Sequence, residues 1–252
     1  RLGETVADRT DMIGRVMVKV SDIDFDLQDS QFDVLGTAYM ILIGLFASDA
    51  GKKGGEFFTP AGPSRLCATL ASLGLDEAKT VGDCTCGSAS MLLEVQKHLT
   101  THKVGHFYGQ EQNATTYNLS RMNMIMHGDG HGGVHHHDGL LNINGIFEER
   151  FDVILTNPPF GQNVDRGQLI SEADKFTDEE MKKKYKKKYG AAYDEALKQV
   201  DDHIGESLLS LYDLGNISTL TEVLFMERCL RLLKKGGRMG MVLPEGVLNN
   251  KN

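Results

Sequence analysis

Long apolar runs and paired cysteines are both missing from this sequence. Its 252 residues contain no apolar run of 18 residues and no signal-peptide pattern, so nothing indicates a membrane-spanning helix or a secretory leader. The four cysteines form no paired CxxC clusters, so neither a zinc site nor a disulfide framework is indicated. We therefore expect a reduced, cytoplasmic protein without a metal ion.

Positive charge is also scarce. Lys and Arg number 27 against 35 Asp and Glu, which gives a formal net charge of −8. Because phosphate contacts by Lys and Arg supply most of the affinity for DNA, a chain of this charge would hold DNA poorly by itself. Hydrophobic residues make up 40% of the chain, enough for a core in one large or two small domains.

Proline is rare, with five residues in all, and two of them are adjacent. They follow a short apolar run, Phe151–Thr156, which is typical of a buried strand. The segment Asn157-Pro158-Pro159-Phe160 must end that strand, because proline lacks an N–H group and fixes φ. The sequence therefore predicts a stiff loop at the carboxyl end of a strand, where open α/β sheets bind ligands.

This loop suits the activation of an exocyclic amino group. Such a group is a weak nucleophile, because its lone pair is delocalised into the ring. The Asn157 side-chain oxygen and the Pro158 carbonyl can both accept a hydrogen bond from it, and Phe160 offers a ring on which a flat base can stack. The prolines keep the arrangement rigid, so little ordering is needed. The plain alternative is an ordinary turn, since Asn-Pro is common in turns.

Three upstream segments have the pattern of a nucleotide-cofactor site. Thr59-Pro60 predicts a helix start with a hydroxyl N-cap and a proline in the first turn, where free N–H groups favour a carboxylate. Thr80–Asp83 predicts a strand, Gly87-Ser88 a turn and Ser90–Leu99 a helix, an order that lets the backbone approach a ligand. Glu111 ends the following strand, where a carboxylate can accept from ribose hydroxyls.

Apolar residues recur at helical spacing in four further segments. Three stripes are expected to face inward: Leu35, Ala38, Tyr39, Leu42, Leu45 and Phe46; Leu119, Met122, Ile125 and Met126; and Val223, Met226, Leu230 and Leu233. The fourth places Pro63, Leu66, Cys67, Leu70 and Leu73 on one face of a helix. Lys234–Gly237 is expected to end the last helix, and Arg238–Leu243 to form the next strand.

In this order, the segments resemble the motifs of DNA methyltransferases that act on adenine N6. Gly55–Pro60 is similar to the segment that opens the S-adenosylmethionine site, and Val81–Ser88 to the cofactor loop. Phe107–Glu111 is similar to the second strand with its acidic end, and Asn157–Phe160 to the catalytic motif. The likeness is greatest to the methylase (modification) subunit of type I restriction-modification systems, and it covers Phe32 to Asn249.

The resemblance implies a fold and a reaction. The fold is α/β, a mostly parallel, Rossmann-like sheet with helices on both faces, preceded by a short helical segment. The reaction is methyl transfer from S-adenosylmethionine to adenine N6 in DNA, with the base leaving the duplex to reach the loop. Two positions depart from the family pattern, because Cys84 stands where proline is common and Ala89 where a second glycine is common. A methyl group at position 89 could crowd the cofactor.

Individual site residues follow from the resemblance. The catalytic residues that it implies are Asn157, Pro158, Pro159 and Phe160. The cofactor-binding residues that it implies are Glu56, Phe57, Phe58, Thr59, Pro60, Ala61, Asp83, Cys86, Gly87, Ser88, Glu111 and Asp138. Of these, Asp138 is expected to accept from the adenine amino group of the cofactor, and Asp129 competes with it for that alignment.

The same resemblance suggests how the chain is divided and what it assembles with. We expect residues 1–50 to be the end of a larger helical domain and residues 51–252 to be the catalytic domain. The chain starts at Arg1 instead of Met, so we expect a fragment. Because of the negative charge, recognition of double-stranded DNA is expected to need a partner. The resemblance implies a specificity subunit, a second methylase copy and a restriction subunit.

Two polar regions remain. The insertion at 165–216 holds six lysines around Tyr185 in Lys182–Lys188. A solvated helix is the simpler interpretation, and a phosphate-tracking arm with a stacking tyrosine, mobile until DNA arrives, is the sharper one. Residues 127–137 contain five histidines among glycines, which favours a flexible loop over the cofactor more than a metal site.

Two other functions stay open at this point. The same four-residue loop serves enzymes that methylate another planar amide or amine, such as an RNA base or a protein glutamine. The departure at Ala89 and the short chain also allow a non-catalytic scaffold subunit that binds the cofactor. Cofactor titration and transfer of a labelled methyl group to DNA separate these possibilities.

Overall fold

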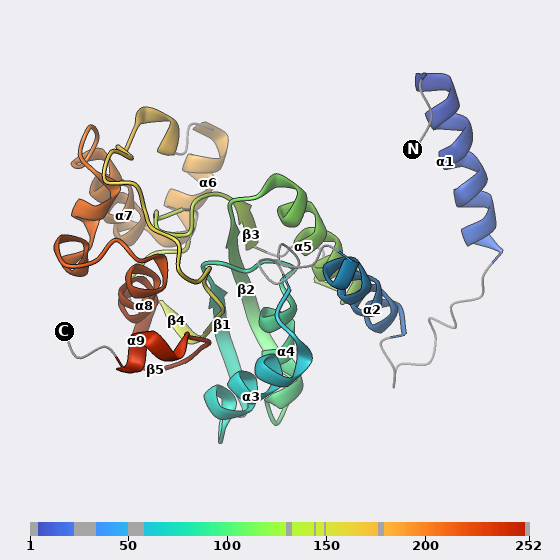
Figure 1. Cartoon of the computed structure of the whole chain (residues 1–252), viewed down its shortest axis with the longest axis horizontal. Coiled ribbons are helices and arrows are strands. Elements are labelled where there is room, and N and C mark those ends of the chain that lie inside the picture. Colours follow the sequence, from blue (N-terminus) through green and yellow to red (C-terminus); the bar gives the residue numbers. More distant parts are fainter. Residues whose placement is uncertain are drawn as a thin grey trace.

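One parallel sheet organises the molecule. The structure, a computed structural model, describes residues 5–22, 34–49, 58–129, 133–143, 145–148, 150–175 and 179–249. The strands are β1 Glu77–Asp83, β2 Lys103–Glu111, β3 Gly133–His136, β4 Phe151–Thr156 and β5 Leu233–Met241. They lie in the order β3-β2-β1-β4-β5, and every neighbouring pair is parallel (Figure 1). The predicted α/β class is confirmed.

The sheet reverses its direction of growth at β1. From β1 the chain adds β2 and then β3 on one side, and it returns to place β4 and β5 on the other. The carboxyl ends of β1 and β4 therefore lie side by side, with Val81 paired to Val153 and Gly82 to Ile154. Such a switch point is where open parallel sheets bind ligands.

Helices cover both faces of the sheet, as predicted. The covering helices are α3 Ala61–Ser72, α4 Ser90–His98, α5 Ala114–Met126 and α8 Thr221–Leu232. Helices α3, α4 and α5 pack on one face, in a core that contains Phe107 and Val153. Helix α8 and the 165–216 insertion cover the other face, in a core that contains Tyr108 and Ile154. Neighbouring strand residues thus point to opposite faces, as strand geometry requires.

The remaining elements lie around this domain. They are α1 Val6–Ser21, α2 Val34–Asp49, α6 Glu179–Tyr189, α7 Ala191–Asp201, α9 Glu245–Asn249 and the short 3-10 helices Glu172–Asp174, Leu208–Leu211 and Asp213–Asn216. Helix α2 contacts α5, where the Tyr39 hydroxyl donates to the Leu119 carbonyl at 3.3 Å, whereas α1 stands apart from the sheet (Figure 1). No helix in the described ranges is long and apolar enough to cross a membrane.

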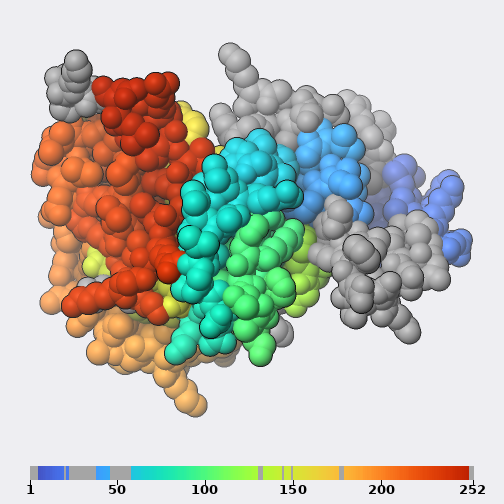
Figure 2. Space-filling view, turned by 90° about the horizontal axis from the view of Figure 1, so that it is seen from below, coloured from blue at the N-terminus to red at the C-terminus, as the bar shows by residue number. Residues whose placement is uncertain are grey.

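The predicted apolar stripes are only partly correct, because many of their members are exposed or half-buried although Cys67 and Leu233 pack against the two cores. The side chains of Leu35 and Phe46 lie outside the described residues. Helix α3 buries Ser64, Ala68, Ala71 and Ser72 instead of its leucines, and it lies at the molecular surface (Figure 2). Helix α5 buries Thr116, Ser120, Asn123 and Met124. Helix α8 buries Thr221, Glu222, Leu224, Phe225, Glu227, Arg228, Cys229 and Leu232. The exposed members of the predicted stripes are Leu42, Leu45, Leu66, Leu70, Leu73, Met122, Ile125 and Leu230.

Two local predictions are also wrong. Strand β5 begins at Leu233 directly after α8, so Lys234–Gly237 belongs to an irregular part of the strand and does not cap the helix. Lys234 there pairs with Asp152, which holds the irregular segment against β4. Residues 133–136 form edge strand β3, paired to β2, and not a flexible loop.

The lysine-rich helix α6 is anchored by its tyrosines. The Tyr185 ring stacks on Tyr189 with centroids 5.9 Å apart, so it is engaged inside the protein and is not a free platform for a base. The Tyr189 hydroxyl lies 3.0 Å from that of Tyr108 on β2, and the Arg150 guanidinium lies 4.4 Å from the Tyr189 ring. These contacts fix α6 to the sheet domain.

Candidate active site

A cavity of about 710 Å³ opens at the carboxyl edge of the sheet. Its wall joins Thr85 after β1, Glu111 at the end of β2, Asp138 after β3 and Asn157 after β4. Four strand ends that are far apart in sequence therefore contribute to one space. Its volume lies within the range of small-molecule sites. The cavity connects the predicted cofactor residues to the predicted catalytic loop.

Asn157 carries an acceptor without a donor. Its side-chain Nδ2 donates to Thr59 Oγ1 at 3.2 Å. Its Oδ1 atom is buried and has no hydrogen-bond partner in the part of the chain that the structure describes. A buried carbonyl oxygen left in this state costs free energy that a ligand N–H group would recover. In the same loop Pro158 is buried, Pro159 lines the cavity and Phe160 is 45% exposed.

The first turn of α8 holds the predicted catalytic loop, Asn157–Phe160, in place. The Thr221 hydroxyl donates to the Pro159 carbonyl at 2.8 Å, and the Thr221 N–H donates to the Gln162 carbonyl at 3.0 Å. The Gly161 N–H donates to both carboxylate oxygens of Glu222 at 3.2 Å. Thr221 and Glu222 are 8% and 3% exposed, so these bonds are protected from water. The loop is thus tied on both sides of Phe160.

Glu111 links the glycine loop to the start of α5. Its carboxylate accepts from the Gly87 N–H at 3.1 Å and from the Asn113 N–H at 2.7 Å. Burial raises the pKa of Glu111, and hydrogen bonds from Asn113 and Gly87 oppose that rise. The carboxylate therefore lines the cavity with its position set by backbone donors from two segments.

The glycine loop after β1 lies mostly behind the cavity wall. Cys86 and Ser88 are 5% and 1% exposed, and of the β1–α4 connection it is Cys84 and Thr85 that line the cavity. Ala89 has φ +63°, a left-handed conformation that favours glycine, yet its methyl group is fully buried in the core. The methyl group does not line the cavity, which argues against crowding of a ligand there.

Asp83 should make the folded protein less stable as pH rises. Burial raises the pKa of Asp83 from 3.8 to about 7, against hydrogen bonds from Thr85 and Thr156 that lower it. Since the unfolded chain releases this proton near its ordinary pKa, the folded state holds the extra proton between 3.8 and about 7. The contribution of this group to the free energy of unfolding falls across that window by roughly 1.4 kcal/mol per pH unit.

Urea unfolding at several pH values across this window measures the effect. Asp83→Asn removes the titrating group and should flatten the fall in stability. The matched control is Asp76→Asn, since Asp76 is exposed near the start of β1 and should leave the slope unchanged. An unaltered slope in Asp83→Asn would mean that burial does not raise this pKa.

Asp138 and Asp129 are separated by the structure. Asp138 lines the cavity and Asp129 does not. Asp138 Oδ1 accepts from the Leu140 N–H at 2.9 Å, and its Oδ2 lies 3.4 Å from the Gln168 side-chain nitrogen. The next residue must be glycine, because a Cβ at Gly139 would lie 1.9 Å from the Cys84 carbonyl oxygen. The geometry therefore favours Asp138 over Asp129 for the position that the resemblance assigns to the adenine amino group of the cofactor.

A protein-family model described as N-6 DNA methylase matches residues 30–203. The chain belongs to the N-6 DNA methylase family. Among its curated relatives, the type I restriction enzyme MpnII methylase subunit of Mycoplasma pneumoniae is 38% identical over 172 residues, which are 64% of this chain and 32% of that protein. The MjaVIII methylase subunit of Methanocaldococcus jannaschii is 33% identical over 55% of this chain and 25% of its own.

Solved structures agree with this assignment. The type I restriction-modification methyltransferase subunit of Streptococcus thermophilus matches with a TM-score of 0.67 and 28% identity, over 100% of this chain and 47% of that one. A class I S-adenosylmethionine-dependent methyltransferase of Listeria monocytogenes shares the fold, with a TM-score of 0.61 at 16% identity over 98% of this chain and 63% of that one. The chain spans about a third or less of the length of these curated relatives.

The structure separates the predicted site residues into groups. Glu111, Asp138, Asn157 and Pro159 line one cavity. Pro158, Phe160, Phe58, Thr59, Pro60, Ala61, Asp83, Cys86, Gly87 and Ser88 do not line it. Glu56 and Phe57 lie outside the described residues. Thr59 is not the predicted N-cap, because Pro60 takes that position and the Thr59 hydroxyl accepts from Asn157 instead.

Several cavity residues were missed. They are Cys84, Thr85, Gln110, Gln112, Asn113, Thr115, Thr116, Gly139, Leu140, Gln162, Asn163, Val164, Gln168, Thr221 and Phe225. Gln110 stands beside Glu111 and Gln162 two residues after Phe160, so a wider window around each motif would have included them. Thr221 and Phe225 come from α8, and no local signal marks them. Within the described ranges no group of three or more His, Cys, Asp or Glu is placed to hold a metal ion.

Proposed function

We propose that this N-6 DNA methylase transfers a methyl group from S-adenosylmethionine to adenine N6 in double-stranded DNA. One observation carries the proposal: Asn157 Oδ1 is buried and without a partner among the described residues, in a residue that lines a cavity shared with Glu111 and Asp138. An exocyclic amino group is a donor that would satisfy this acceptor. Membership in the family supports the same substrate.

The residues around the cavity fit the cofactor. Glu111 and Asp138 lie at adjacent strand ends, where two carboxylates can accept from the ribose hydroxyls and the adenine amino group. The cavity of about 710 Å³ is large enough for a nucleoside with an amino-acid arm. When bound there, S-adenosylmethionine supplies a methyl group activated by a positively charged sulfur.

The chain itself would position the target amino group. Asn157 Oδ1 and the Pro158 carbonyl would accept its two hydrogens and draw the nitrogen toward tetrahedral geometry. The half-exposed ring of Phe160 would stack on a base that has left the duplex. Thr221 and Glu222 would keep this loop rigid, so that catalysis is mainly positioning. No general base is assigned.

We further propose that the chain acts as part of a modification complex. The two curated relatives described above are methylase subunits of type I restriction enzymes. A net charge of −8 leaves much of the grip on DNA to a partner, for which a specificity subunit, a second methylase copy and a restriction subunit are proposed. In this division, residues 1–50 end a helical domain and residues 51–252 form the catalytic domain with an insertion at 165–216.

Transfer of tritium from methyl-labelled S-adenosylmethionine tests the proposed reaction. The full chain is incubated with genomic DNA, with and without a coexpressed specificity subunit, and the DNA is digested to nucleosides. The label should be recovered as N6-methyladenine, with a large increase in the presence of the specificity subunit. Matched reactions contain total RNA or a protein extract in place of DNA.

Three results would contradict the proposal. Label in RNA or in glutamine would support the other amino-group substrates. Label in another DNA base would exclude adenine N6. Binding of S-adenosylmethionine by calorimetry without transfer to any substrate, even in the assembled complex, would support a scaffold.

A further inference from the structure

Four consecutive carbonyl oxygens next to the cavity are all held by buried side chains. The Gln110 side-chain nitrogen donates to the carbonyls of Asp138 at 2.7 Å and of Leu141 at 2.8 Å. Arg228 donates to the carbonyls of Gly139 at 3.3 Å and of Leu141 at 3.2 Å, and the Tyr212 hydroxyl donates to that of Leu140. The loop that presents Asp138 is therefore fixed from β2, from α8 and from the insertion.

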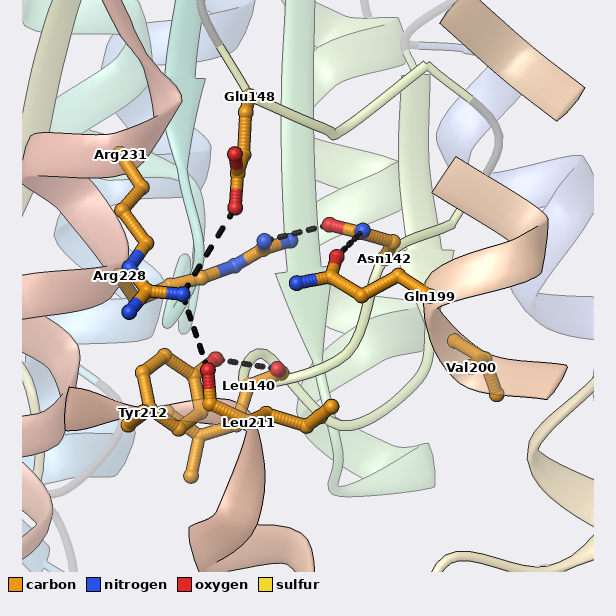
Figure 3. A pocket seen from close by; sticks show the side chains of 9 residues that line it. All are labelled: Leu140, Asn142, Glu148, Gln199, Val200, Leu211, Tyr212, Arg228 and Arg231. Atoms are coloured by element: carbon orange, nitrogen blue, oxygen red, sulfur yellow. Dashed lines mark hydrogen bonds and ion pairs between the residues drawn. The ribbon is translucent and has the colours of Figure 1, made fainter. Parts of the chain in front are cut away.

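Arg228 is unusual because it is a buried cation held by neutral acceptors. It is 3% exposed, and no carboxylate among the described residues pairs with it. Besides the two carbonyls above, its guanidinium donates to the Asn142 side chain (Figure 3). It also donates to the Ile146 carbonyl at 3.2 Å. A buried charge is costly unless its hydrogen bonds are complete. The planar guanidinium reaches these acceptors only if residues 139–142 and 146 keep their positions.

The insertion contacts the same loop at three places. Tyr212, near its end, is 4% exposed and donates to the Leu140 carbonyl. Gln199 of α7 accepts from the Asn142 side chain (Figure 3). The Gln168 side chain lies 3.4 Å from the Asp138 carboxylate. Burial raises the pKa of Tyr212, so its hydroxyl stays protonated and remains a donor.

The side chains behind the Asp138 loop pack closely and do not form a second ligand site. The gap among Leu140, Asn142, Tyr212, Arg228 and their neighbours has a volume of about 10 Å³. That volume has room for one water molecule at most. The side chains in Figure 3 therefore act on the loop and not on a separate molecule.

We propose that Tyr212 and Arg228 are positioning residues that set the affinity of the Asp138 loop for the cofactor. The 165–216 insertion is then part of the support of the cofactor site. The inference rests on the proposed function, because the Asp138 loop must bind S-adenosylmethionine. Neither side chain reaches the reacting atoms, so their loss acts on cofactor affinity and not on the chemical step.

Removal of a single oxygen atom tests the inference. In Tyr212→Phe, calorimetry should show S-adenosylmethionine binding weakened by about fivefold, the effect of one lost hydrogen bond. The KM for S-adenosylmethionine should rise in parallel, while kcat at saturating cofactor stays at the wild-type value. Arg228→Lys keeps the charge but loses the planar fork, and it should weaken binding by about tenfold or more.

The insertion contains its own matched control. Tyr193 of α7 is 2% exposed, and its hydroxyl has no hydrogen-bond partner among the described residues. Tyr193→Phe makes the same chemical change in an equally buried tyrosine and should leave cofactor affinity unchanged. Melting curves of each variant show that it is folded before binding is measured.

The outcomes separate the two proposals. Failure of the wild-type chain to bind S-adenosylmethionine would overturn the proposed function, and this inference with it. Wild-type binding with an unchanged affinity in Tyr212→Phe and Arg228→Lys would overturn the inference alone. Equal weakening in Tyr212→Phe and Tyr193→Phe would show general loosening of the insertion and would also overturn it, as would a fall in kcat at unchanged KM.

Discussion

Replacing Asn157 with alanine is expected to abolish methyl transfer and to leave S-adenosylmethionine binding close to wild type. The variant loses the buried Oδ1 acceptor that has no partner among the described residues. Removal of one positioned group that acts on the reacting atoms typically costs about 10²–10³-fold in kcat. Glu111 and Asp138 remain in place on neighbouring strand ends, so the cofactor should still bind. Tritium transfer to DNA measures the first effect and calorimetry the second.

A matched variant makes this test specific. Asn118 is exposed on α5 and does not line the cavity, so Asn118→Ala should match wild type in both assays. Asn157→Asp separates the two roles of the side chain, since it keeps an acceptor oxygen but loses the nitrogen that donates to Thr59. Equal loss of transfer and of cofactor binding in Asn157→Ala would assign the residue to the cofactor site. Retained transfer would exclude it from catalysis.

Replacing Glu111 with alanine should weaken cofactor binding strongly. Hydrogen bonds to a charged group contribute about 1.5–3 kcal/mol, which corresponds to roughly a 10- to 150-fold change in affinity. The carboxylate also holds the N–H groups of Gly87 and Asn113, so its loss releases both flanking segments. Calorimetric titration with S-adenosylmethionine measures the loss directly, without the need for a DNA substrate.

Two further variants separate the causes of that loss. Glu111→Gln keeps one acceptor oxygen but not the charge. Its affinity for S-adenosylmethionine should lie between those of wild type and Glu111→Ala. Glu77→Ala removes an exposed carboxylate at the opposite end of β1 and should have no effect. If Glu111→Ala bound the cofactor as tightly as Glu77→Ala does, the carboxylate could not be a cofactor ligand.

Helix faces show where reasoning from apolar spacing failed. In α3 the small residues Ala68 and Ala71 are buried and Leu70 is 64% exposed, because small side chains let the helix approach the sheet closely. In α5 the buried side includes Asn123, whose side chain donates to the Ser88 carbonyl at 2.7 Å. In α8 it includes Arg228. Buried hydrogen-bonding residues look like surface residues in a sequence, and only their partners reveal them.

Local chemistry was enough to find the strand ends at Glu111 and Asn157, and the resemblance supplied the parallel sheet. Alternation of strand and helix predicts that carboxyl ends meet at one edge, and proline after Asn157 marks where β4 stops. Glu111 and Asn157 could therefore be named from short motifs that end a strand in a polar residue, whereas Asp138 was implied by the resemblance alone.

Tertiary structure alone decided which other groups complete the site. Thr221 and Arg228 act on loops that lie 62 and 89 residues earlier in the chain. Neither has a motif of its own, since a hydrogen bond between distant segments depends on how α8 packs on the sheet. The burial of Ala89 in the core, in place of the cavity, depends on the same packing. Short-range patterns record backbone preferences, whereas contacts across the fold depend on where whole elements are placed.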